Sequence, residues 1–324
     1  MFDGNPFFVC LAAILGMASI CTLSARGQAR DGIACAMTRP APEMNVLIND
    51  EHHGRFELRF IDGPVRIRKD RLPGLALRPA GVDGRGEFII DQLGIGGEVF
   101  SNVPAIAWDP PAMYGPDDAP DGLLTLDVFR GRLVTLDVAN GTLRIADGTL
   151  AEAADAVPYV VRTGNDAGGR GMYFEALLAG KPIELALSAN AQTTLHFNDA
   201  AAADLPLKDE PGLIGRVITE KGESDITGAR LAVPLVAGGL VLESAGVRFS
   251  DLFDSPALGI GGLDGYAITF DHERLKMRFT RSARQEVAAD AVAITRIDDS
   301  LTSLRDTFNR DKEKVRLVLI LSPT

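Results

Sequence analysis

The segment that decides the fold is residues 122–145, GLLTLDVFRGRLVTLDVANGTLRI. Within it, residues 133–137 (LVTLD) and 143–145 (LRI) have the two-residue alternation of strands with one buried face. Asn140-Gly141 lies between them and is typical of a hairpin turn, because both residue types tolerate a positive φ. The segment therefore predicts a β-hairpin.

A related pattern recurs near the end of the chain, in residues 257–279 (ALGIGGLDGYAITFDHERLKMRF). Two further segments of the first half also align without gaps with segments of the second half. The aligned pairs are 54–63 (GRFELRFIDG) with 181–190 (KPIELALSAN), 93–108 (LGIGGEVFSNVPAIAW) with 235–250 (LVAGGLVLESAGVRFS), and 132–145 with 266–279. Three pairs in the same order and at similar offsets indicate an internal duplication.

The duplicated unit is predicted to be a small all-β structure. Phe56, Leu58 and Phe60 alternate with charged residues, and glycine and proline interrupt the chain at short intervals. Helical patterns are sparse, at residues 199–205 and 298–309. We therefore expect an all-β fold made of two similar lobes.

Composition limits the kinds of partner. At 324 residues, with 46% hydrophobic and 24% charged side chains, the chain is long enough for two lobes with cores of their own. Its net charge of −11 argues against a nucleic-acid partner, because phosphate binding needs a basic surface.

The N-terminus predicts export. Residues 7–23 (FFVCLAAILGMASICTL) are uninterruptedly apolar or small, and small residues follow that suit cleavage after Ala25 or Ala29. No Lys or Arg precedes this run, so an uncleaved membrane anchor stays open beside a cleaved signal peptide. Residues 1–29 are taken as this signal or anchor, and the membrane is contacted only through it. We expect a periplasmic or secreted protein.

The repeated motifs resemble those of the retropepsin and pepsin-type aspartic peptidases, in particular the exported bacterial proteins with two such lobes in one chain. The resemblance is found in residues 181–195 (KPIELALSANAQTTL), in residues 95–108 (IGGEVFSNVPAIAW) and in the LDVF and DVANG stretches of residues 126–141. The resemblance implies a two-lobed acid-protease fold. Its first lobe would be residues 43–148 and its second lobe residues 155–282.

Catalysis in this family implies two aspartates that face each other and share one proton. The gapless alignment places the first loop at Ile61, Asp62 and Gly63, and the second at Ser188, Ala189 and Asn190. The two aspartate positions would then hold Ile61 and Ser188, neither of which can share a proton as a carboxylate does. The resemblance therefore implies a degenerate catalytic site.

An alternative alignment shifts the first loop by one residue and puts Asp62 in the catalytic position. Such a shift turns side chains to the opposite face of a strand unless the strand bends. No Asp or Glu occurs between Ser188 and Asn198, so the second lobe could not complete a pair. On the preferred alignment, Asp62 is a turn residue before Gly63.

No metal or cofactor site is predicted. His52-His53 is the only paired histidine, and no Cys, His or Glu stands near it at metal-ligand spacing. The glycine clusters at residues 94–97 and 259–262 do not match a nucleotide-binding fingerprint.

Two functions remain open from the sequence. The first is a non-catalytic exported protein that binds an extended peptide, a protein or another ligand in the cleft between the lobes, an extended peptide by strand pairing with the cleft walls. The second is an aspartic-type peptidase with an unconventional site that uses Asp62. Residues 283–324 are predicted to form an appended helix and strand that pack on the lobes.

Overall fold

The computed structural model describes residues 32–37, 41–80, 86–111, 114, 118–163, 170–190, 194–219 and 222–284. The predicted signal or anchor of residues 1–29 and nearly all of the predicted helix-strand tail lie outside these ranges. Among the described residues, no helix is long and apolar enough to cross a membrane. The chain is all-β over this part, as predicted, and its described helices are four short 3₁₀ segments.

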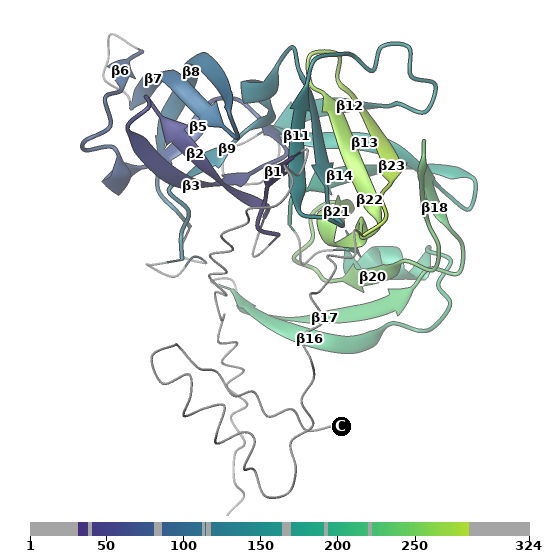
Figure 1. The fold of residues 1–324 in the computed structure, drawn as a ribbon. Helices are drawn as coiled ribbons and strands as arrows, with labels where there is room; N and C mark the ends of the chain where they lie inside the picture. The colour runs from purple at the N-terminus through teal and green to yellow at the C-terminus, as the bar shows by residue number, and fades with distance from the viewer. Residues whose placement is uncertain are drawn as a thin grey trace, which may run out of the picture.

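The first half of the chain forms a seven-stranded sheet that closes on itself (Figure 1). Its order is β2 (Glu43–Ile48), β3 (His52–Leu58), β9 (Gly122–Leu124), β5 (Val65–Arg68), β8 (Glu98–Trp108), β7 (Glu87–Ile95) and β6 (Arg78–Pro79). Pairing of β2 with β7 closes six of these strands into a barrel. The helix η1 (Lys69–Arg71) follows β5.

The second half repeats this strand order. It runs β13 (Arg170–Leu178), β14 (Lys181–Ser188), β21 (Ala257–Gly259), β15 (Leu195–Phe197), β20 (Gly246–Phe249), β17 (Gly222–Arg230) and β16 (Gly212–Thr219). The hairpin of β18 (Leu235–Ala237) and β19 (Leu240–Leu242) pairs with β13, as β7 pairs with β2. The helix η3 (Asp199–Ala203) covers part of the predicted helix, and the Asn198 side chain caps it by accepting a hydrogen bond from the Ala200 N–H.

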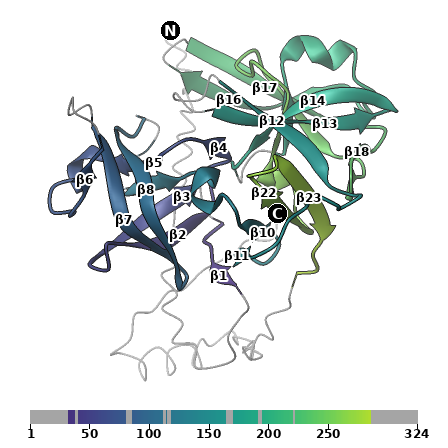
Figure 2. The ribbon, with the colours of Figure 1, turned by 90° about the horizontal axis from the view of Figure 1, so that it is seen from above.

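Four strands join the two halves (Figure 2). They are β11 (Thr142–Ala146), β10 (Leu133–Asp137), β22 (Tyr266–Asp271) and β23 (Lys276–Arg281), in that order and antiparallel. Thr135 lies directly opposite Thr269 and their hydroxyls are 2.9 Å apart, so a local two-fold axis passes between β10 and β22. This junction sheet relates the two halves.

Short strands complete the junction. β1 (Ile33–Ala34) pairs with β11, and β12 (Val157–Thr163) pairs with both β23 and β13. β4 (Ile61–Asp62), from the first half, pairs with the start of β13 in the second. Phe60 and Phe270 are fully buried with ring centroids 4.9 Å apart, so aromatic packing also crosses the junction.

Candidate functional site

The predicted loop positions lie at the ends of equivalent strands. Ile61 and Asp62 form β4, and Gly63 follows in a turn with a φ of 107°. Ser188 ends β14, and its hydroxyl accepts a hydrogen bond from the backbone N–H of Asn190 at 3.2 Å. The hydrogen bond of the Ser188 side chain is thus local, whereas the Asp62 side chain reaches His272 across the junction.

Strand pairing gives a register for the two loops that differs from the gapless alignment. β3 runs parallel to β9 with Leu58 opposite Leu124, and β14 runs parallel to β21 with Ser188 opposite Gly259. Thr125 and Gly259 are equivalent, because each is the N-cap of the 3₁₀ helix that follows: η2 (Leu126–Phe129) and η4 (Ile260–Gly262). The residue after Leu58 therefore corresponds to Ser188, and that residue is Arg59 rather than Ile61.

Arg59 occupies its position as part of a polar network. Its guanidinium lies 2.7 Å from a carboxylate oxygen of Glu57, which is almost completely buried. The Tyr114 hydroxyl donates to the same carboxylate at 2.8 Å and also contacts Arg59. The two equivalent loop positions thus hold an arginine and a serine, and no pair of carboxylates faces across the halves there.

A different cluster does join the halves. It consists of Asp62 on β4, Asp127 on η2 and His272, which directly follows β22. Nε2 of His272 lies 3.3 Å from Oδ1 of Asp62 and 3.3 Å from Oδ1 of Asp127. His272 is only 2% exposed, while Asp62 and Asp127 are 11% and 28% exposed.

Neighbouring groups hold this Asp62–Asp127–His272 cluster in place. The Gly63 N–H donates to Oδ2 of Asp127 at 2.6 Å, and the Tyr159 hydroxyl lies 2.7 Å from Nδ1 of His272. Arg130 donates through Nε to Oδ1 of Asp127 at 3.1 Å, and its Nη2 lies 3.5 Å from Oδ1 of Asp62. Arg130 is half-exposed, so the cluster meets solvent on that side.

The two carboxyls of the cluster have strongly different proton affinities. A hydrogen bond with Asp127 raises the pKa of Asp62, and burial and the negative charge of Asp127 act in the same direction. Burial alone would raise the pKa of Asp127, but hydrogen bonds from His272, Asp62, Arg130 and the Gly63 N–H together hold it far below its usual range. The pair therefore shares one proton over part of the acid range, with Asp62 as its preferred carrier.

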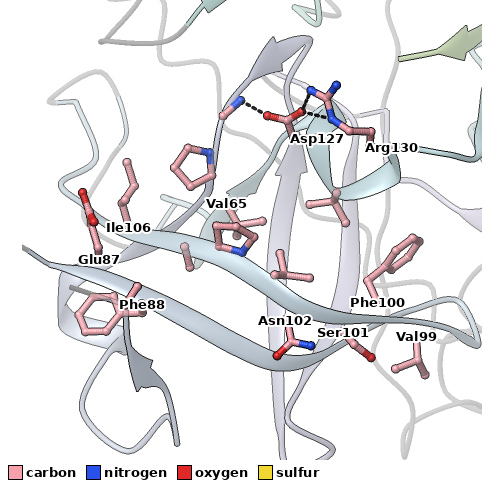
Figure 3. A pocket seen from close by; sticks show the side chains of 17 residues that line it. Val65, Glu87, Phe88, Val99, Phe100, Ser101, Asn102, Ile106, Asp127 and Arg130 are labelled. Carbon is pink, nitrogen blue, oxygen red and sulfur yellow. Dashed lines mark hydrogen bonds and ion pairs between the residues drawn. The ribbon is translucent and has the colours of Figure 1, made fainter. Parts of the chain in front are cut away.

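An open groove of about 750 Å³ begins at this cluster (Figure 3). Asp127 and Arg130 lie at one end, and the β7–β8 hairpin contributes most of the wall. The lining is largely apolar, with Phe88, Phe100 and Val128 partly exposed over buried Val65, Val103 and Ala105. Such a surface suits apolar side chains of a ligand, with a polar group at one end for orientation.

The second half has a smaller hollow of about 390 Å³ at the equivalent place, lined in part by Gly261, Asp264 and Tyr266. In the register of Thr135 with Thr269, Gly261 corresponds to Asp127 and Asp264 corresponds to Arg130. The carboxylate–guanidinium pair is therefore particular to the first half.

Of the predicted site residues, Asp62 belongs to the cluster and Gly63 binds Asp127 through its backbone N–H. Ile61 precedes it on β4, and Ser188 and Asn190 lie in the second loop; Ala189 is buried. Asp127, Arg130, Tyr159 and His272 were not predicted as site residues. They are far apart in the sequence, and the junction sheet brings them together.

No protein-family model matches the chain, and no curated protein matches it.

Proposed function

We propose that this is an exported protein with an aspartic-peptidase-like, two-lobed fold that binds an extended peptide segment without cleaving it. A peptidase needs a substrate-binding groove and a pair of carboxylates that share a proton, and the proposal rests on the difference between these two features here. The first-half groove beside the β7–β8 hairpin is open and apolar. The equivalent loop positions hold Arg59 and Ser188, which cannot share a proton as two aspartates do.

The groove is the proposed binding surface. An extended peptide can place alternate side chains against Phe88, Phe100 and Val128, because successive side chains of a strand point to opposite sides. Arg130 at the end of the groove offers a hydrogen-bond donor to a carbonyl or carboxylate of the ligand. This refines the expected inter-lobe cleft to a groove that lies in the first half and ends at the junction.

The test is binding of peptides from a digest of an unfolded protein, measured by retention on immobilised protein and by fluorescence anisotropy of the retained peptides. Ser101→Trp fills the groove from an exposed position, and we expect it to weaken binding at least tenfold. Leu213→Trp, on exposed β16 outside the groove, is the matched control and should bind as the wild type does. Equal affinity of both variants would contradict the proposal.

One observation favours a second candidate, an acid peptidase. Asp62 and Asp127 are hydrogen-bonded carboxyls with pKa values displaced in opposite directions, as in a proton-sharing catalytic pair. Against it, Asp127 already accepts bonds from Gly63, Arg130 and His272, so it is poorly placed to activate a water molecule. Cleavage of an unfolded protein at acid pH that disappears in Asp62→Asn would establish the peptidase and overturn binding without hydrolysis.

A further inference from the structure

We propose that Asp62, Asp127 and His272 form a binding site for one divalent transition-metal ion of the zinc class. This inference does not require that a peptide binds, although Asp127 and Arg130 also line one end of the groove. Two carboxylates and an imidazole are a common ligand set for such ions, with a fourth position left for water or a ligand.

The spacing of the ligand atoms fits four-coordinate geometry. Bonds of about 2.0–2.2 Å to nitrogen and oxygen at tetrahedral angles separate the ligand atoms by roughly 3.3 Å. Nε2 of His272 lies 3.3 Å from the Oδ1 atom of each aspartate, and all three ligand atoms lie within 4.8 Å of one another. An ion can therefore be seated without moving the backbone.

Outer contacts direct the ligand atoms inward. Tyr159 binds Nδ1 of His272 at 2.7 Å, which leaves Nε2 facing the two carboxylates. The Gly63 N–H binds Oδ2 of Asp127 at 2.6 Å, which leaves Oδ1 on the side of His272. Metal-binding histidines and carboxylates in proteins are oriented by outer hydrogen bonds of this kind.

Arg130 is the group that competes with an ion. Its guanidinium contacts Oδ1 of Asp127 and approaches Oδ1 of Asp62, so it supplies the positive charge that the two carboxylates require. Because its side chain is half-exposed and lines the groove, it can turn into solvent when an ion takes over that charge. The competing explanation is a cluster that is complete with Arg130 and binds no ion.

Replacing Arg130 therefore distinguishes a metal site from a purely structural cluster. Loss of its charge should strengthen metal binding only if an ion takes the place of the guanidinium. Full-length protein is stripped with a chelator, and Zn²⁺ is added while binding is followed by calorimetry. We expect one ion per chain in the wild type. Binding should be at least tenfold weaker in Asp62→Asn and in His272→Gln, and several-fold tighter in Arg130→Gln, which lacks the competing cation. The double variant His52→Ala/His53→Ala, which removes the paired histidines outside the cluster, should bind as the wild type does.

Absorption of Co²⁺ in place of Zn²⁺ gives a second readout. We expect the intense visible bands of four-coordinate Co²⁺ in the wild type and in Arg130→Gln. Three outcomes would overturn the proposal. The first is no saturable metal binding to the wild type, and the second is metal affinity in Asp62→Asn and His272→Gln equal to that of the wild type. The third is loss of metal binding only in the His52→Ala/His53→Ala variant. A correctly folded Arg130→Gln that binds no more tightly would also overturn it, since the ion would then not share the place of the guanidinium.

Discussion

Two isosteric substitutions in the junction cluster are expected to change the stability of the protein in opposite directions. Asp62→Asn should stabilise the fold near neutral pH, and Asp127→Asn should destabilise it. The comparison is made in chelator-containing buffer, so that no metal ion contributes. Each variant replaces one carboxyl oxygen by an NH₂ group and leaves the packing volume nearly unchanged.

The gain of stability in Asp62→Asn is expected because the pKa of Asp62 is raised in the folded protein. A carboxyl whose pKa is higher in the folded state contributes stability below its unfolded pKa, and that contribution is lost as the pH rises through the folded value. Asparagine donates an N–H to Asp127 at every pH, as protonated Asp62 does only at low pH. The advantage of Asp62→Asn should therefore be small near about pH 4 and should grow towards neutrality.

The loss of stability in Asp127→Asn follows from the lowered pKa of Asp127, which is shifted in the opposite direction to that of Asp62. A carboxyl with a lowered pKa contributes stability above its unfolded pKa, which disappears as the pH falls below about 4. The hydrogen bond from the Gly63 N–H to this charged group is worth about 1.5–3 kcal/mol, and the half-exposed ion pair with Arg130 adds at most about 1 kcal/mol. A total of about 2–4 kcal/mol lowers the Tm of a chain of this size by roughly 5–15 °C.

Thermal unfolding of the wild type and both variants, followed by circular dichroism at several pH values between about 4 and 8, checks both signs. The control is Asp264→Asn, which changes an exposed carboxylate at the position equivalent to Arg130 and should leave Tm within about 1 °C. If Asp62→Asn lowers Tm at neutral pH as much as Asp127→Asn does, the two carboxyls do not share a proton in the way described.

Three further predictions concern the fold. Phe60→Ala should cost about 3–5 kcal/mol in urea unfolding because it opens a cavity against Phe270, whereas Val99→Ala, at a 57% exposed position, should cost less than about 0.5 kcal/mol. Gly239→Ala should cost about 1–3 kcal/mol in the same assay, because the added Cβ would lie 2.4 Å from the carbonyl oxygen of Phe279. The control is Gly246→Ala, whose Cβ would meet nothing within 4 Å and which should be neutral or slightly stabilising. Burial raises the pKa of Cys35 to about 12, so in a variant with Cys10→Ser and Cys21→Ser a thiol reagent at mildly alkaline pH should react only after unfolding; fast reaction of the native protein would contradict the buried position.

The all-β class was predictable because strand alternation is a local property of the sequence. The duplication was visible in the same way, and the aligned residues Thr135 and Thr269 prove to face each other on the local two-fold axis. The Gly96-Gly97 and Gly238-Gly239 pairs also occupy equivalent turns, between β7 and β8 and between β18 and β19. Periodicity and repeat matching thus located the strands.

The register of the first loop was not predictable from alternation. The sequence alignment matched Ser188 with Ile61, and strand pairing matches it with Arg59, two residues earlier. A shift of two residues keeps every side chain on the same face of a strand, so the hydrophobic pattern is the same in both registers. Only the parallel partners of β3 and β14 distinguish them.

The cluster itself follows from the two-fold pairing of the junction strands. Leu133 lies opposite Asp271, so His272, the next residue, passes beside the chain that leaves η2 with Asp127 and Arg130. The same symmetry brings Val138, the counterpart of His272, towards η4, where Gly261 replaces Asp127. The fold therefore creates two equivalent positions at the junction. The position at η2 carries Asp127 and His272, and the position at η4 carries Gly261 and Val138.

A two-fold axis between Thr135 and Thr269, if assumed from the repeat, is enough to predict that residues 127 and 272 lie close together. The repeat does not predict the role of Asp62, because the sequence that follows Ser188 in the second half contains no Asp or Glu before Asp199. The residues that the two halves share thus form the scaffold of this junction. Ligand or metal binding there depends on the residues by which the two halves differ.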